Sequence, residues 1–432
     1  MIAPSNFGRT LGLSLALGLC IWAARADTPA LDVLPGMPPV ADPANLYSEI
    51  SSGKLSPAVA DALPRVYVPN LRSNDVYVID PETFKVVDRF RVGGQPQHIV
   101  PSWDLKTLWV NNNGLRGPQG SLTPIDPKTG KPGQSIAVED PYNLYFTPDG
   151  RSAIVVAERL ERLDFRDPIE MTLQQSLPTP GCAGVNHADF SIDGRYAIFT
   201  CEFGGGGLIK VDMVERKIVG HLNLTRTNLI TQASLQLPDG QLPDGQLPDG
   251  QLPDGQRLDA AICGVNVGVG GGMPQDIRVS PDGKVFFVAD MMADGVYLVD
   301  GEEFKQIGYI PTGIGTHGLY PSRDGTKLYV VNRGSHDVRG RRRGPGSISV
   351  LDFETREIVA NWPIPRGGSP DMGNVSADGK FLWLSARYDN VVYAIDTTTG
   401  AVTTIPVGTE PHGLTVWPQP GRYSLGHTGN MR

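Results

Sequence analysis

A hairpin that recurs along the chain constrains the fold more than any other feature. Its clearest copy spans residues 316–333, where an apolar run leads through the turn Ser-Arg-Asp-Gly into the β-prone strand Leu-Tyr-Val-Val. Aspartate hydrogen-bonds its own backbone in such a turn and glycine tolerates positive φ, so both residues suit the position. Equivalent turns begin at Ser102, Thr147, Ser191, Ser280, Ser322, Ser376 and Trp417.

The spacing of these turns predicts the architecture. Successive copies are 45, 44, 89, 42, 54 and 41 residues apart, and a period of about 40–45 residues with four short strands per unit is typical of β-propeller blades. A third strand that ends in aspartate follows most hairpins, at residues 122–126, 208–212, 296–300, 348–352 and 392–396. We therefore expect an all-β fold, a seven-bladed β-propeller with four-stranded antiparallel blades.

The two ends of the repeat region predict how the ring closes. Residues 65–92 read as three strands with no inner strand before them, and residues 413–416 read as an inner strand with no outer strands after it. One blade built from N- and C-terminal strands would complete the ring and remove its free edges. Residues 422–425 also read as a strand and compete with residues 65–68 for one place in this blade, so both assignments remain open.

One interval, of 89 residues, is twice the period. It contains four tandem copies of Gln-Leu-Pro-Asp-Gly at residues 236–255, followed by a stretch rich in glycine and valine. Because short polar repeats of this kind favour disorder over a packed core, we expect a low-complexity QLPDG insert at about residues 225–272. An eroded eighth blade is the alternative.

The N-terminal segment predicts export. Residues 1–26 combine a positive charge, a short apolar core at residues 11–22 and a small-x-small cleavage site, the pattern of a signal peptide. The mature protein would be periplasmic or secreted, without an integral membrane span, because the apolar core is short for a bilayer. A lipoprotein anchored at Cys20 is the alternative. The proline-rich residues 27–64 read as an extended N-terminal arm across the ring, and residues 65–432 as the propeller.

Several motifs resemble the YVTN family of seven-bladed β-propellers. They are the sequence Tyr-Val-Val-Asn at residues 329–332, the Asp-Gly turns, the third strands ending in aspartate, and Gly-x-x-Pro at residues 93–96 and 408–411. The likeness covers residues 65–429. It implies the ring fold, but not an activity, because lactonase-like, haem d1-like and surface-layer propellers share that fold and do different things.

The order of turns assigns loops to the two faces of the ring. The Asp-Gly turns lie on one face, while the starts of inner strands and the ends of second strands lie on the other, where most unusual polar residues gather. A mixture of imidazole, carboxylate and guanidinium groups fits a small anionic or polar ligand. The candidate ligand-binding residues are His98, His187, Asp276, His317, Arg333, Asp371, Arg387 and His412.

Histidines dominate this face and suggest a metal. Imidazole suits Cu, Zn, Fe and Ni, so a divalent transition metal held by three or four of these side chains is one hypothesis. The alternative is a polar lining that binds only water and backbone. His98 and His187 stand one position later in their strands than His317 and His412, and strand alternation would point them differently. The candidate metal ligands are His98, His317, His412 and His427.

Three cysteines remain after signal cleavage. Cys182 precedes one inner strand and Cys201 ends its hairpin partner. Export to an oxidising compartment would favour a disulfide between them. Cys263 would then be left over in the QLPDG insert. A Cys–His metal site that includes His187 is the alternative.

Two function classes remain open, and a third is disfavoured. The first is a binding or scaffold propeller, monomeric, that recognises a small molecule or protein on its histidine-rich face. The second is a metal- or cofactor-dependent enzyme at the same face, lactonase-like or related to oxidoreductases. The third is nucleic-acid binding through the basic run at residues 339–343, which the net charge of −8 disfavours.

Overall fold

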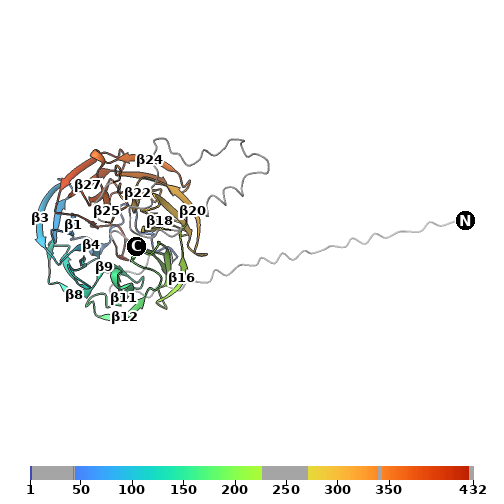
Figure 1. Ribbon diagram of the computed structural model, residues 1–432, viewed down its shortest axis with the longest axis horizontal. Helices are drawn as coiled ribbons and strands as arrows, with labels where there is room; N and C mark the ends of the chain where they lie inside the picture. Colours follow the sequence, from blue (N-terminus) through green and yellow to red (C-terminus); the bar gives the residue numbers. More distant parts are fainter. Residues whose placement is uncertain (2–41, 43, 226–270, 339–342, 428–432) are drawn as a thin grey trace.

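The computed structural model describes residues 1, 42, 44–225, 271–338 and 343–427. The signal peptide apart from Met1, the QLPDG repeats, Cys263 and residues 339–342 of the basic run lie outside the described residues. Seven antiparallel sheets stand around a ring, each forming one blade, as Figure 1 shows. This confirms the seven-bladed β-propeller predicted from the repeat.

Blades 1 to 3 follow one another along the chain. Blade 1 contains β4 (Pro96–Pro101), β5 (Leu108–Asn112), β6 (Gln119–Asp126), and the short β7 (Lys131–Pro132) and β8 (Ile136–Glu139), which both pair with β6. Blade 2 contains β9 (Pro141–Phe146), β10 (Ala153–Ala157), β11 (Arg162–Arg166) and β12 (Leu173–Pro178). Blade 3 contains β13 (Val185–Phe190), β14 (Tyr196–Cys201), β15 (Leu208–Asp212) and β16 (Lys217–Leu222).

Blades 4 to 6 repeat the same order from inner to outer strand. Blade 4 contains β17 (Pro274–Val279), β18 (Val285–Asp290), β19 (Gly295–Asp300) and β20 (Lys305–Pro311). Blade 5 contains β21 (Thr316–Pro321), β22 (Lys327–Asn332), β23 (Ser347–Asp352) and β24 (Ile358–Pro363). Blade 6 contains β25 (Pro370–Val375), β26 (Phe381–Ala386), β27 (Val391–Asp396) and β28 (Val402–Pro406).

Blade 7 closes the ring with strands from both ends. Its order is β29 (Thr415–Trp417), β1 (Arg65–Asn70), β2 (Asp75–Asp80) and β3 (Lys85–Arg91). Val66 of β1 lies opposite Val416 of β29. Among the described residues, the only helical segments are three 3-10 turns, η1 (Pro57–Val59), η2 (Glu158–Leu160) and η3 (Pro365–Gly367), and no helix is long and apolar enough to cross a membrane.

The residues after β29 resolve the competition for a place in blade 7. They do not join that blade but turn toward the centre of the ring and run beside β9. The Phe146 amide donates to the Leu425 carbonyl at 3.0 Å, and the His427 amide donates to the Leu144 carbonyl at 2.9 Å. Tyr423 and Leu425 are buried in the apolar core between blades. This C-terminal segment therefore delivers His427 to the inside of the ring.

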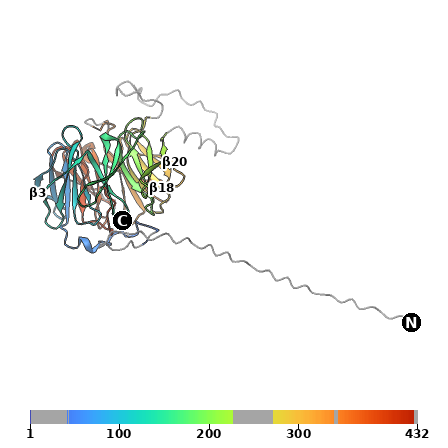
Figure 2. The ribbon, with the colours of Figure 1, turned by 90° about the horizontal axis from the view of Figure 1, so that it is seen from below.

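The Asp-Gly turns lie on the face that the N-terminal arm covers. In the turn of blade 5, the Ser322 hydroxyl donates to Asp324 and accepts from the Lys327 amide at 2.9 Å, while Gly325 takes a φ of +70°. Residues 44–64 cross this face, and Figure 2 shows them beneath the ring. The Leu46 amide donates to the Ile192 carbonyl at 2.9 Å.

A disulfide fixes the open end of the β13–β14 hairpin. The sulfur atoms of Cys182 and Cys201 are 2.01 Å apart, and both residues are buried. The bond leaves neither sulfur as a thiolate for metal ligation, and it ties the loop that precedes β13 to the end of β14. The residue that this hairpin directs toward the ring centre is His187.

Candidate ligand site at the ring centre

Polar side chains from all seven blades meet at the centre of the ring. They come from the N-terminal halves of the inner strands, from the segment before β29, and from the C-terminal segment. Because His98 of blade 1 contacts rings from blades 3 and 7, these groups meet across the axis rather than along one wall. The buried members are His98, Asn143, His187, Asp276, His317, Asp371, His412 and His427.

A β-bulge places five of these side chains: His98, His187, Asp276, His317 and Asp371. Pairing with the neighbouring strand shifts in register near the N-terminal ends of β4, β13, β17, β21 and β25. In β13, Asn186 and His187 both stand where the partner has one residue, and in β21 His317 and Gly318 do the same. A bulge interrupts alternation and re-aims side chains. The one-residue offset between His187 and His317 therefore does not send them to opposite faces.

Three imidazoles form the histidine triangle, which we define as His98, His187 and His427. The ring centroids are 5.3 Å apart for His98 and His187, 5.4 Å for His98 and His427, and 4.5 Å for His187 and His427. Both ring nitrogens of His98 and Nε2 of His187 are buried without a hydrogen-bond partner. Buried polar atoms almost always have partners, so these point to a ligand that the protein alone does not supply.

Asn143 orients two corners of the triangle. Its Nδ2 lies 3.2 Å from His187 Nδ1 and 3.0 Å from His427 Nδ1, and its Oδ1 accepts from the Leu144 amide at 2.9 Å. With the amide in this orientation both Nδ1 atoms accept, and both Nε2 atoms carry the hydrogen. Within the described part of the chain, His187, His427 and Asp276 each offer one ligand atom, and these atoms lie within 4.8 Å of one another.

Asp276 is held by its own strand and its neighbour. Its Oδ1 accepts from Arg278 Nη1 at 2.8 Å and from the Ile277 amide at 2.9 Å, and Oδ2 accepts from the Leu319 amide at 2.9 Å. Oδ1 lies 3.7 Å from His427 Nε2. Burial raises the pKa of Asp276 to about 6, although Arg278 and the two amides oppose the rise.

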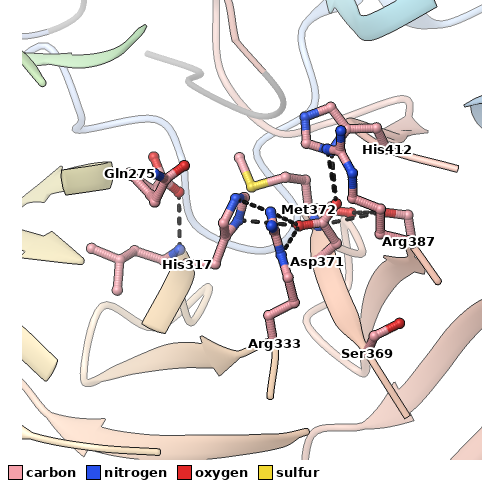
Figure 3. A network of polar contacts seen from close by, with 12 residues as sticks. Gln275, His317, Arg333, Ser369, Asp371, Met372, Arg387 and His412 are labelled. Carbon is pink, nitrogen blue, oxygen red and sulfur yellow. Dashed lines mark hydrogen bonds and ion pairs between the residues drawn. The ribbon is translucent and has the colours of Figure 1, made fainter. Parts of the chain in front are cut away.

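A second carboxylate, Asp371, is the centre of a charged network that Figure 3 shows. Its Oδ1 accepts from Arg333 Nε at 3.0 Å and Nη2 at 2.7 Å, and Arg387 Nη1 lies 3.7 Å from Oδ2. Burial alone would raise the pKa of Asp371, but Arg333, His317 and His412 hold it well below its usual range. This carboxylate stays ionised and orients the groups around it.

His412 and His317 both contact Asp371 but differ in what remains free. His412 Nδ1 lies 2.7 Å from Asp371 Oδ2, so it donates there, and its buried Nε2 has no partner. The His412 and His98 ring centroids are 4.8 Å apart. His317 instead has Nδ1 3.3 Å from Asp371 Oδ1 and Nε2 against Arg333 Nη2. His412 Nε2 is therefore free for a ligand, while His317 Nδ1, which also lacks a hydrogen-bond partner, faces the Asp371 carboxylate.

All five histidines are uncharged at neutral pH. Burial lowers the pKa values of His98, His187, His317 and His427 well below the usual value, and it lowers that of His412 to about 4. Neutral imidazole is the form that binds a transition metal. The ring centre therefore gathers neutral nitrogen ligands beside the carboxylates of Asp276 and Asp371.

An acidic pair lies beside the triangle. Glu202 accepts from Asn186 Nδ2 at 2.8 Å and from Gln275 Nε2 at 3.2 Å. Burial and the neighbouring Glu202 raise the pKa of Glu158 well above its usual value. Tyr142 also enters the site, with its ring 5.4 Å from that of His98.

The structure brings the candidate residues together in three groups. His98, His187, His412 and His427 surround the axis; Arg333, His317 and Arg387 surround Asp371; Asp276 pairs with an arginine that the sequence analysis did not name. That arginine, Arg278, stands two residues after Asp276, and alternation along β17 places both on the inner face. An inspection of every second residue on either side of each candidate would have found Arg278, because these residues share a face of the strand.

Comparisons with known proteins agree on the fold. A model of the YNCE-like β-propeller family matches residues 36–170 and 260–420, which supports the propeller repeat without confirming the YVTN label. No curated protein matches the sequence significantly.

Solved structures with similar folds include proteins named for different roles. A putative 6-phosphogluconolactonase from Bacteroides uniformis ATCC 8492 is 16% identical, with a TM-score of 0.57, over 82% of this chain and 99% of that chain. Hydrazine synthase from Kuenenia stuttgartiensis is 16% identical, with a TM-score of 0.54, over 83% and 96%. Dihydro-heme d1 dehydrogenase NirN in complex with DHE is 15% identical, with a TM-score of 0.53, over 88% and 82%. At these identities the likeness shows the fold alone.

Proposed function

Because the chain belongs to the YNCE-like β-propeller family, we propose that it is an exported binding propeller that holds a divalent transition-metal ion at the ring centre. The ligands are the histidine triangle and Asp276. The observation that carries the proposal is the set of buried ring nitrogens of His98 and His187 that have no partner in the protein. Each such atom costs about 1–3 kcal/mol when left unsatisfied, and a metal ion would remove that cost at one nitrogen of each ring.

The ring separations fit ligation. At a metal–nitrogen distance of about 2.0–2.1 Å in a tetrahedral site, the centroids of two imidazole ligands lie roughly 5 Å apart. The three separations in the histidine triangle are 5.3, 5.4 and 4.5 Å. Imidazole with one carboxylate suits Zn, Fe, Cu or Ni rather than Ca or Mg, which prefer oxygen ligands.

Asn143 would orient the ligands around the ion. A histidine that binds a metal through Nε2 donates its Nδ1 hydrogen to a neighbour. Asn143 contacts Nδ1 of both His187 and His427, so ligation turns its amide over and presents Oδ1 to both. This exchange replaces the two bonds that Nδ2 donates with two bonds that Oδ1 accepts from the imidazoles, and it gives up the bond from the Leu144 amide.

The disulfide supports the exported part of the proposal. Disulfides persist in oxidising compartments and are rare in reducing ones, and the Cys182–Cys201 bond lies at the edge of the site. Its function there would be to hold the start of β13, and with it His187.

Elemental analysis tests the metal. The protein is purified without chelator or metal resin and its metal content is measured by plasma mass spectrometry, beside H98A/H187A and the matched control H221A, which removes an exposed histidine. We expect about one ion per chain in the native protein and the control, and none in the double variant. A native protein that stays metal-free after dialysis against Zn, Fe, Cu and Ni would refute the proposal, as would an unchanged ion content in the double variant.

Catalysis is the second candidate, and one pair favours it. The Asp371–His412 contact of 2.7 Å leaves His412 Nε2 as a buried base beside His98, in the manner of an oriented general base. Hydrolysis of a lactone panel by the native protein and by H412Q is the test. Activity that H412Q loses while keeping its ion supports catalysis, whereas no turnover by the metal-loaded native protein leaves binding as the function.

A further inference from the structure

A second site lies on the opposite face, beneath the N-terminal arm. A cavity of about 300 Å³ opens between residues 45–51 of the arm and the inner strands and Asp-Gly turns of blades 4, 5 and 6. This volume is at the lower end of the range for small-molecule pockets. The aromatic and aliphatic part of its lining includes Tyr47, Ile50, Val279 and Phe353.

One arginine in this cavity has no acidic partner. Arg323 donates from Nε to the Ser376 carbonyl at 3.0 Å and from Nη2 to the Val375 carbonyl at 2.7 Å and to the Gln419 side chain. Each of these acceptors is neutral, and no carboxylate of the described residues lies within ion-pair distance of Arg323. Burial lowers the pKa of its guanidinium to about 10. Arg323 is partly buried, and Asp378 stabilises its charge without forming an ion pair, so an anionic ligand would supply a direct counter-ion.

A second arginine faces the same cavity from β17. The Arg278 side chain is only 7% exposed, and its Nη1 donates to Asp276 Oδ1 at 2.8 Å and to the Ile277 carbonyl at 2.6 Å. Its Nε and Nη2 make no hydrogen bond within the described part of the chain. Two guanidinium groups from adjacent blades thus offer unused donors to one cavity.

The carboxylates of the lining are already engaged elsewhere. Asp189 accepts from the Tyr47 hydroxyl at 2.7 Å, the Val279 amide at 2.8 Å and the Phe190 amide at 2.9 Å. Asp324 accepts from Ser322 and Thr326 within its own turn. Asp324 is thereby held within its own turn, and, against the effect of burial, the nearby charges of Asp276 and Asp189 raise the pKa of Arg278.

From this arrangement we propose that the cavity binds a small organic anion, a carboxylate or phosphate carried on a compact aromatic body. The anionic group lies against Arg323 and Arg278, and the body packs between the arm and the turn of blade 5. The site is separate from the histidine triangle and does not depend on the metal. Arg278 joins the two, because the guanidinium that pairs with Asp276 also lines the cavity.

Calorimetric titration of the full-length protein with benzoate, phenyl phosphate and the uncharged benzamide tests the site. We expect saturable binding of at least one of the two anions, and at least tenfold weaker binding of benzamide. The two anions distinguish a carboxylate site from a phosphate site. No binding of either anion, or equal binding of benzamide, would overturn the proposal.

Variants place the binding in the cavity. R323Q should weaken anion binding at least tenfold, while K284Q, which removes an exposed charge from the same face, should leave it unchanged. S51E adds a carboxylate to the lining without removing a contact of the ring, so it keeps the test valid if R323Q unfolds. Anion binding that survives S51E unchanged, or that K284Q abolishes, would contradict the assignment.

Discussion

His412 donates from Nδ1 to Asp371 Oδ2 across 2.7 Å, and this contact fixes which nitrogen of His412 remains free. Asp371 is itself held by Arg333 on its other oxygen. One carboxylate from blade 6 thus sets the orientation of an imidazole from blade 7 and the position of a guanidinium from blade 5. The free Nε2 lies beside His98, where the proposed ligand site begins.

Asp371 should be essential for stability. Replacing it by asparagine leaves Arg333 and Arg387 buried beside a neutral amide, and breaking a buried charge network in this way costs about 3–5 kcal/mol. Urea unfolding of D371N should show this loss. The matched variant D352N breaks a more exposed pair with Lys327 and should cost much less, because solvent screens such a pair. Equal costs for the two variants would mean that the network contributes little.

Acid should destabilise the metal-free protein through His412. Its folded-state pKa is about 4, against about 6.5 in the unfolded chain. The unfolded state therefore binds the proton first, and the stability present above pH 6.5 falls by about 3 kcal/mol as pH drops to 4. Unfolding titrations between pH 4 and 7 measure the slope. In H412Q the slope of unfolding free energy against pH should be smaller by up to one proton. An unchanged slope would assign the acid sensitivity to other groups.

Gly413 should be required for the position of His98. A Cβ at this residue would lie 2.0 Å from His98 Nδ1, so G413A pushes the imidazole away from the triangle. We expect the variant to lose the metal ion while keeping its β-sheet circular dichroism. The control G133A places a Cβ 3.1 Å from the Pro124 ring on the outer part of blade 1 and should bind the ion normally. Full occupancy in G413A would show that His98 is not a ligand.

The disulfide should contribute to stability through the unfolded chain. Its cysteines are 19 residues apart, and closing a loop of this length is worth about 3 kcal/mol on the chain-entropy model. C182A/C201A should lose roughly this amount in urea unfolding, and reduction of the native protein in denaturant should have the same effect. A loss below about 1 kcal/mol would indicate that the unfolded chain is already compact there.

Much of the fold could be predicted because the hairpin is a local signal. The Ser-x-Asp-Gly turn needs only its own residues to form, so each copy marks a blade independently of its neighbours. The order of the turns along each blade then assigned His98, His317 and Asp371 to one face of the ring. Ring closure also followed, because residues 413–416 needed a partner strand and residues 65–68 supplied one.

The site itself depended on features without a local signal. Bulges in the inner strands align His187 with His317, yet a bulge depends on pairing with the next strand and leaves no pattern in the sequence. His427 reaches the axis because the C-terminal segment packs beside β9, a contact between residues far apart in the chain. The cavity around Arg323 forms only when the arm lies over blades 4 to 6.

Anomalous X-ray diffraction from crystals of the natively purified protein tests the central claim most directly. Data collected above and below the absorption edge of the metal found by elemental analysis locate the ion without reference to the protein. The account predicts one strong anomalous peak at about 2.0–2.2 Å from ring nitrogens of His98, His187 and His427 and from an oxygen of Asp276. A ring centre without anomalous density, or a peak bound only by surface groups, would contradict it.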